Sequence, residues 1–224
     1  MSTLVAGTRF HDLGLRTTSA AVLVPVVIVA LVLGGWVWIA LTLVFFAAML
    51  WEWRGLSRHV AAPNRSSFLA AGIVYAGLPA AALLWLRLLP AGLVDVLFLL
   101  IVVWATDIGA YAAGRLIGGP KLAPAISPGK TVSGALGGLV IGVLAGIAVA
   151  RDPAGILPAA LLSVVSQIGD LAESALKRRL GVKDSGRTIP GHGGLFDRLD
   201  GVLAAAPVAA LLALIAQGGL PLWR

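Results

Sequence analysis

The stretch from Ser166 to Gly201, SQIGDLAESALKRRLGVKDSGRTIPGHGGLFDRLDG, concentrates charge in an otherwise apolar chain. It contains five of the 10 acidic residues and six of the 17 lysines and arginines. If residues 161–178 form one helix, its polar side chains are spaced three or four residues apart and share one face. These side chains are Ser166, Asp170, Ser174 and Lys177. A polar stripe therefore emerges from an apolar helix and leads into a glycine-rich loop, whose backbone amides can approach an anion closely.

The composition around this stretch is that of a membrane protein. The chain has 224 residues, is 59% hydrophobic and has a mean hydropathy of +0.97, which is too apolar for a soluble domain. It contains no cysteine, and this excludes disulfides, thiolate nucleophiles and thiolate zinc sites. The first apolar run, residues 20–33, continues after two glycines into a second run, so we expect a hairpin of two spans and not a cleaved signal peptide.

The hydropathy pattern predicts an all-α, polytopic integral membrane protein with about seven transmembrane helices. The expected spans are residues 19–34, 36–51, 68–86, 91–107, 132–150, 154–170 and 199–216. We divide the chain into N-terminal transmembrane helices with a short basic tail, residues 1–90, and a catalytic transmembrane region, residues 91–224. The catalytic region contains two polar loops, residues 107–131 and 170–198.

The distribution of basic residues predicts the orientation. If the N-terminus is cytoplasmic, only Arg87, Arg151 and Arg224 of the 17 lysines and arginines fall in outside segments. This is a strong positive-inside bias. We therefore expect a protein of the cell (inner) membrane whose N-terminus and two polar loops face the cytoplasm and whose C-terminus lies outside.

Three motifs carry a resemblance to a known family. The longest is SALKRRLGVKDSGRTIPGHGGLFDRLD, residues 174–200. The shorter ones are Asp107-Ile108-Gly109-Ala110-Tyr111-x2-Gly114-Arg115 and Ser127-Pro128-x-Lys130-Thr131-x2-Gly134. Together they resemble the signature of the phosphatidate cytidylyltransferases, the CDP-diacylglycerol synthases. That family usually carries an acidic residue where this chain has Ser133.

The resemblance implies a nucleotidyltransferase of phospholipid biosynthesis. Such an enzyme transfers CMP from CTP to phosphatidic acid and gives CDP-diacylglycerol and pyrophosphate. It implies Mg²⁺ as cofactor, with a second cation such as K⁺ compatible with the number of carboxylates, and no nucleic acid as partner. Two alternatives stay open: a CTP-dependent kinase of a polyprenol or other lipid alcohol, and a non-enzymatic cation transporter or channel subunit.

Three aspartates are the predicted metal ligands. An unpaired carboxylate such as Asp170 at the end of a span costs roughly 2.5 to 3.5 kcal/mol in hydrocarbon, so it is usually paired or ligating. Asp197 and Asp200 share a face at three-residue spacing, although such aspartates also begin ordinary helices. Because Mg²⁺ takes one or two protein carboxylates, we choose Asp170 and Asp197 as ligands and Asp200 as a third ligand or an orienting group. Lys177 completes the predicted catalytic set.

The substrate-binding candidates come from the same motifs. They are Ser174, Arg178, Lys183, Asp184, His192 and Arg198 from the long motif, with Asp107, Tyr111, Ser127, Lys130 and Thr131 from the shorter ones. We assign His192 to phosphate contact or loop shaping, because a phosphate monoester with a second pKa of about 6 needs no general base. The sequence Gly129-Lys130-Thr131 is not a P-loop, since the required earlier glycine is replaced by Pro124 and no strand precedes it.

One predicted span carries a glycine at every fourth position. These residues are Gly134, Gly138, Gly142 and Gly146, a spacing that lets two helices pack closely. Packing within the chain is the simpler interpretation, and a homodimer interface is the alternative.

Overall fold

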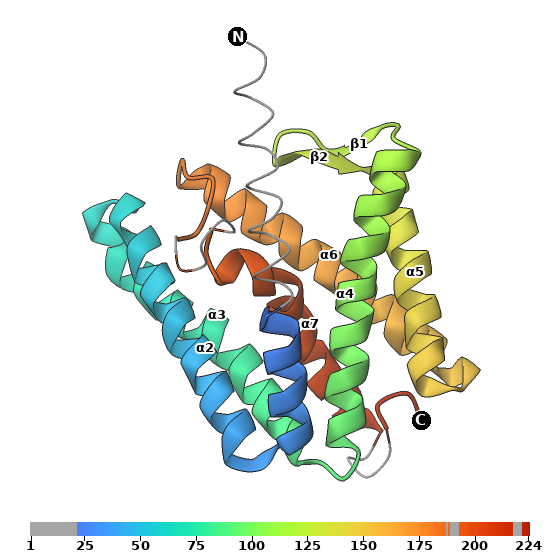
Figure 1. Ribbon diagram of the computed structural model, residues 1–224. Helices are drawn as coiled ribbons and strands as arrows, with labels where there is room; N and C mark the ends of the chain where they lie inside the picture. Colours follow the sequence, from blue (N-terminus) through green and yellow to red (C-terminus); the bar gives the residue numbers. More distant parts are fainter. Residues whose placement is uncertain (1–21, 187, 189–192, 217–220) are drawn as a thin grey trace.

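The computed structural model describes residues 22–186, 188, 193–216 and 221–224. In this part of the chain, six helices are long and apolar enough to cross a membrane, and Val22–Leu33 forms a shorter apolar helix. The six are α2 (Gly35–Leu56), α3 (Ala62–Leu88), α4 (Gly92–Leu116), α5 (Val132–Ala150), α6 (Ile156–Arg179) and α7 (Phe196–Ile215). The predicted all-α polytopic fold is confirmed (Figure 1).

The expected N-terminal hairpin is present. Helix Val22–Leu33 turns into α2 at Gly34, whose positive φ of 62° is a conformation that glycine adopts without strain. The Arg87 side chain of α3 fixes this turn by donating a hydrogen bond from Nε to the Leu31 carbonyl at 2.9 Å. A short 3₁₀ helix, η1 (Ser57–His59), links α2 to α3 at the other end.

An aromatic cluster joins α2 and α3 to the start of α7 in the C-terminal half. The Trp53 ring of α2 stacks on Phe68 and Tyr75 of α3, with ring centroids 4.6 and 5.5 Å apart. Phe196, the first residue of α7, packs on the same ring at 5.7 Å. Aromatic pairs of this kind add stability beyond the area they bury, so α2 and α3 provide a firm support for the start of α7.

Helix α4 lies at the centre of the bundle. Its apolar side chains Val96, Phe98, Leu99 and Val102 are fully buried, and a hydrogen bond of 2.9 Å from Thr106 Oγ1 to Ser163 Oγ connects it to α6. Helix α7 packs closely against this core because it presents small alanine side chains to it. They are Ala205, Ala206, Ala209 and Ala213.

The glycine stripe of α5 faces α4 and α6. A Cβ atom at Gly138 would lie 2.8 Å from the Thr106 carbonyl oxygen, and one at Gly146 would lie 3.2 Å from a methyl group of Val102. The stripe is therefore used for packing within the chain, as the simpler interpretation predicts. The homodimer stays a prediction.

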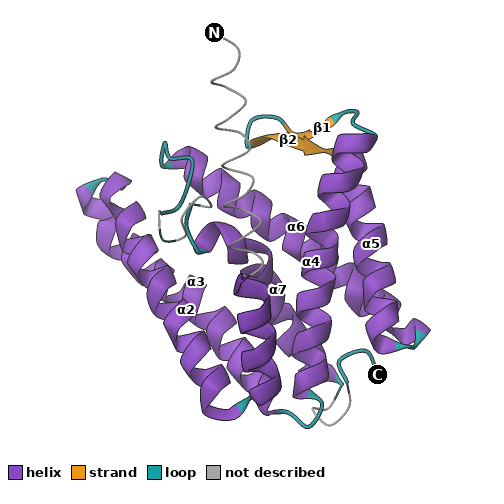
Figure 2. Cartoon of the chain, viewed as in Figure 1, coloured by secondary structure: helices purple, strands orange, loops and turns teal. Residues whose placement is uncertain are grey.

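The polar connections between helices gather at one end of the bundle. A two-stranded antiparallel sheet, β1 (Lys121–Ala123) and β2 (Ser127–Thr131), connects α4 to α5, with Lys121 opposite Thr131. Figure 2 shows this hairpin at the same end as the segment between α6 and α7. The 3₁₀ helix η2 (Pro153–Gly155) lies between α5 and α6, at the opposite end of the bundle, where the C-terminus also lies (Figure 1).

Both predicted polar loops begin as helix. Asp107 is inside α4, which continues to Leu116, and Asp170 is inside α6, which continues to Arg179. The helix expected over residues 161–178 is thus contained in α6. The functional carboxylates therefore project from rigid helices near one end of the bundle.

Candidate active site

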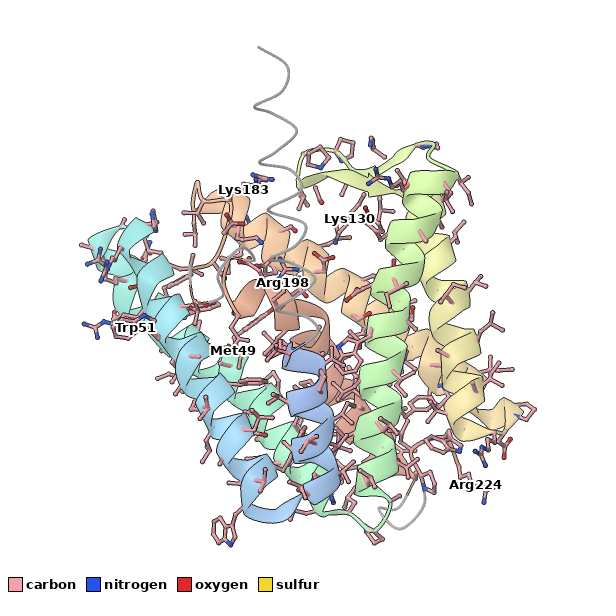
Figure 3. The ribbon with its side chains drawn as sticks, viewed as in Figure 1. Met49, Trp51, Lys130, Lys183, Arg198 and Arg224 are labelled. Carbon is pink, nitrogen blue, oxygen red and sulfur yellow. The ribbon has the colours of Figure 1, made fainter. Side chains whose placement is uncertain are left out.

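A cleft of about 1550 Å³ opens at the end of the bundle that carries the β-hairpin. Among the described residues, its walls come from helix Val22–Leu33, α4, β2, the start of α5, α6 and the start of α7. Six carboxylates and four basic side chains line it. The carboxylates are Asp107, Asp170, Glu173, Asp184, Asp197 and Asp200, and the basic side chains are Arg115, Lys130, Lys177 and Arg198. Figure 3 shows Lys130 and Arg198 on the inner side of this end, far from Arg224.

Three of these carboxylates converge. Asp170 and Glu173 of α6 and Asp200 of α7 each offer one oxygen, and the three oxygens lie within 4.8 Å of one another. Asp170 and Glu173 are three residues apart on one helix face, and the close approach of α7 brings Asp200 to them. Glu173 is almost fully buried, and its Oε1 atom has no hydrogen-bond partner in the described part of the chain. Three hard oxygen donors in this arrangement suit a small divalent cation.

Lys177 connects this cluster to Asp197. Its Nζ atom lies 2.8 Å from Glu173 Oε2 and 2.6 Å from Asp197 Oδ1. One ammonium group thus compensates two buried carboxylates, and it leaves the second oxygen of Glu173 available. Breaking such a pair would leave an uncompensated buried charge, which is strongly destabilising.

Asp197 is saturated by donors from its own chain. Its Oδ2 atom accepts hydrogen bonds from the Gly194 amide at 2.9 Å and from both the amide and the hydroxyl of Ser185 at 3.0 Å. Together with Lys177, these donors fill the acceptor positions of Asp197. Among the described residues, Asp170, Glu173 and Asp200 form the carboxylate group that could share a metal ion, and Asp197 as a ligand stays a prediction.

The β-hairpin brings a second basic residue to the cluster. Lys130 Nζ of β2 lies 2.5 Å from Asp170 Oδ2. The next residue, Thr131, is the N-cap of α5 and accepts a hydrogen bond from the Gly134 amide at 3.0 Å. Ser133, the second residue of α5, donates to the Gly118 carbonyl, so it ties the start of α5 to the segment that follows α4. These contacts hold Lys130 at the mouth of the cleft.

A buried carboxylate from α2 holds the segment that precedes α7. Glu52 is 2% exposed. Its Oε1 accepts hydrogen bonds from the Leu195 amide at 2.7 Å and from the Thr188 hydroxyl. Its Oε2 accepts from the Phe196 amide and the Ser185 hydroxyl, both at 3.0 Å. Ser185, Thr188, Leu195 and Phe196 thus surround a carboxyl group that is part of the protein.

The predicted site residues divide into three groups. Those that line the cleft are Asp107, Tyr111, Lys130, Thr131, Asp170, Lys177, Asp184, Asp197, Arg198 and Asp200. Those that are described but do not line it are Ser127, Ser174, Arg178 and Lys183. Arg178 instead donates from Nε to the Ile126 carbonyl at 3.2 Å. His192 lies outside the described residues.

Sequence reasoning missed Glu173 and Glu52 for different reasons. Glu173 could have been found from its spacing, because it is three residues after Asp170 and four before Lys177 and so shares their helix face. Glu52 had no such signal, since its partners lie 133 to 144 positions further along the chain. Only the folded chain brings those amides and hydroxyls to α2.

The fold and the cleft define a polytopic membrane protein with a mixed acidic and basic site at one end of its helix bundle. Residues 58–216 match the model of the Cytidylyltransferase family, and the chain belongs to that family.

Curated proteins with similar sequences include phosphatidate cytidylyltransferases of several bacteria. A protein of Brucella suis biovar 1 named phosphatidate cytidylyltransferase is 52% identical over 160 residues, which is 68% of this chain and 59% of that protein. Another of that name from Brucella abortus biovar 1 is 54% identical over 65% of this chain and 57% of its own length. One from Staphylococcus saprophyticus is 41% identical over 70% of this chain and 64% of its length. The chain therefore spans 57 to 64% of the length of these relatives.

Proposed function

We propose that this protein transfers CMP from CTP to phosphatidic acid, giving CDP-diacylglycerol and pyrophosphate. The observation that carries the proposal is one cleft in which three convergent carboxylates and three basic residues adjoin an apolar wall. The basic residues are Lys130, Lys177 and Arg198. Membership of the Cytidylyltransferase family and the name of the relatives support the same activity.

The apolar wall suits a lipid substrate. It consists of Val22, Val24 and Val26 of the first described helix and Trp104 and Ile108 of α4. Val24 and Ile108 are 38% and 68% exposed in the described chain. A phosphatidate headgroup can then enter the cleft from the bilayer side while its acyl chains stay among apolar side chains.

Asp170, Glu173 and Asp200 would hold Mg²⁺. The unpartnered, buried Oε1 atom of Glu173 supports this assignment, because a buried polar atom without a partner is costly unless a ligand satisfies it. When bound there, Mg²⁺ would neutralise charge on the triphosphate. A second cation such as K⁺ is part of the proposal, and the remaining cleft carboxylates, Asp107 and Asp184, are the residues available to it.

The basic residues would act on the phosphates. A lipid phosphate oxygen attacks the α-phosphorus of CTP, the bond from the α-phosphorus to the bridging oxygen breaks, and pyrophosphate leaves. Lys130 and Arg198 lie where they can neutralise the charge that grows on the leaving group. The attacking phosphate is already ionised near neutral pH, so no residue has to remove a proton from it.

We also propose that the cleft faces the cytoplasm. The β1–β2 hairpin, whose Lys130 and Thr131 line the cleft, lies at the end of the bundle opposite η2 and the C-terminus (Figure 1). In the predicted orientation the basic residues of both polar loops stay on the cytoplasmic side, as the positive-inside rule requires, and CTP reaches the cleft directly.

The reaction products test the proposal. Purified protein is incubated with labelled CTP, phosphatidate and Mg²⁺, and we expect pyrophosphate and labelled CDP-diacylglycerol only when both substrates are present. Release of CDP with a lipid alcohol would support the kinase instead. Absence of any turnover, with cation flux into vesicles, would support the transporter.

A further inference from the structure

We infer that Glu52 is a positioning residue that holds the α6–α7 segment and the start of α7 in the geometry the cleft requires. The inference rests on the proposed function for its catalytic consequence. It concerns a residue outside residues 58–216, the range that matches the family model.

The first observation is that α7 lacks a cap of its own. The first amides of a helix have no partner inside the helix, and a serine, threonine, aspartate or asparagine normally supplies one. Here the N-cap is Leu195, and no side chain of the α7 N-terminus caps it. Glu52 replaces that cap, because its carboxyl oxygens accept hydrogen bonds from the Leu195 and Phe196 amides. A negative charge at this position also complements the helix dipole.

The second observation is that the backbone is shaped to fit Glu52. A Cβ atom at Gly186 would lie 2.9 Å from Glu52 Cγ and Cδ, and one at Gly194 would lie 2.9 Å from Glu52 Cδ. Any side chain at either position would displace the carboxylate. These two glycines of the long motif thus leave room for the Glu52 side chain. Their role is not limited to letting a substrate phosphate approach the backbone.

The third observation is a continuous chain of contacts from Glu52 to the carboxylate cluster. Ser185 Oγ lies 3.0 Å from Glu52 Oε2 and 3.0 Å from Asp197 Oδ2. Because a hydroxyl carries one proton, Ser185 donates to one carboxylate at a time and joins both. Asp197 contacts Lys177, and Lys177 contacts Glu173. Displacement of Glu52 therefore reaches Asp200 through α7 and Glu173 through this chain.

The test uses Glu52→Gln, which keeps the size of the side chain but turns one acceptor oxygen into a donor group facing two donors. Amide hydrogen exchange should become faster in the peptide that contains Leu195 and Phe196. The Mg²⁺ concentration that half-maximally raises the unfolding temperature, measured with Mg²⁺ alone, should increase about tenfold. Turnover should fall by on the order of tenfold to a hundredfold, as expected for a small misplacement of reacting groups.

Asp95→Asn is the matched control. Asp95 is also fully buried, and it accepts a hydrogen bond of 2.9 Å from the Leu222 amide, but it does not line the cleft. This variant should lower stability while it leaves exchange at Leu195 and Phe196 and the Mg²⁺ requirement unchanged. If Glu52→Gln acted only through a general loss of stability, both variants would show the same changes in amide exchange and in Mg²⁺ requirement.

Thr188→Val is the second variant, in case Glu52→Gln fails to fold. It removes one of the four donors to Glu52 and should give smaller changes in the same direction. If the variants that fold match Asp95→Asn in exchange and in Mg²⁺ requirement, the inference is wrong. If the wild type transfers no CMP but Glu52→Gln still accelerates exchange and weakens Mg²⁺ binding, the proposed function fails and the positioning role stands.

Discussion

Glu173 and Asp197 both contact Lys177, yet their remaining oxygens differ. Asp197 Oδ2 is filled by Ser185 and Gly194. Glu173 Oε1 has no partner within the described residues, and one oxygen of Glu173 lies within 4.8 Å of an oxygen of Asp170 and of Asp200. A cation needs acceptor positions that the protein has left open, so the two residues have separable roles in the proposed mechanism.

Amide substitutions separate these roles. Asp170→Asn, Glu173→Gln and Asp200→Asn each remove one charged ligand, and we expect the half-saturating Mg²⁺ concentration to rise about tenfold or more. Asp197→Asn should lower turnover and thermal stability, because it weakens the contacts to Lys177 and Ser185, but should leave the Mg²⁺ requirement within about twofold. Titration of turnover with Mg²⁺ in the four purified variants measures this. A larger shift for Asp197→Asn than for Glu173→Gln would instead support Asp197 as the ligand, as the sequence predicts.

Lys130 gives a second prediction for single residues. It lies 2.5 Å from Asp170 Oδ2 and lines the cleft from β2. In the proposed mechanism it neutralises charge on the substrate phosphates, so Lys130→Met should reduce kcat/KM for CTP by about tenfold or more. Lys121→Met is the control, because this exposed lysine on β1 does not line the cleft. Equal kinetics in the two variants would exclude a role for Lys130 in binding CTP.

At the scale of elements, the sequence predicts the helices better than their polar ends. Long apolar runs indicate a span whatever their neighbours are, and all six long helices overlap a predicted span. Hydropathy does not show that α4 continues to Leu116 or α6 to Arg179, because these last turns direct polar residues into a cleft and not into lipid. The hairpin β1–β2 is too short to give a period-two pattern.

The candidate site could be predicted only in part, because sequence patterns report local features and not contacts made in the folded chain. Local motifs place Asp170, Lys177 and Asp200 near one another because they lie on the two helices, α6 and α7, that one connection joins. They do not show which carboxylate oxygens the fold has already satisfied, and this decides between Glu173 and Asp197. The contribution of Glu52 depends on packing between α2 and α7, which no local pattern encodes.

The packing of α5 on α4 makes a prediction at this scale. Gly138→Val places methyl groups where a Cβ atom would already lie 2.8 Å from the Thr106 carbonyl oxygen. We expect a loss of about 1–3 kcal/mol in stability, as for other overpacked interiors, seen as a lower unfolding temperature in detergent. Leu136→Val on the exposed face of α5 is the control and should have little effect. An unchanged unfolding temperature for Gly138→Val would contradict the packing of these helices.

At the scale of the whole molecule, the proposed orientation predicts which end of the bundle a thiol reagent reaches from outside the cell. The chain has no cysteine, so single cysteines report accessibility directly. Lys183→Cys lies at the cleft end and Ala154→Cys in η2 at the other end, and both positions are exposed. An impermeant thiol reagent should label only Ala154→Cys in intact cells and only Lys183→Cys in sealed inverted vesicles. The reverse pattern would place the cleft outside the cytoplasm.

The central claim is that the cleft joins the α-phosphorus of CTP to a lipid phosphate. The most direct measurement follows two labels, with CTP labelled in separate reactions at the α-phosphorus and at the γ-phosphorus, in vesicles that contain the protein and phosphatidate. We expect the α label to appear in the lipid product and the γ label to appear entirely in pyrophosphate. Transfer of the γ label to lipid, with the α label retained in CDP, would contradict the central claim.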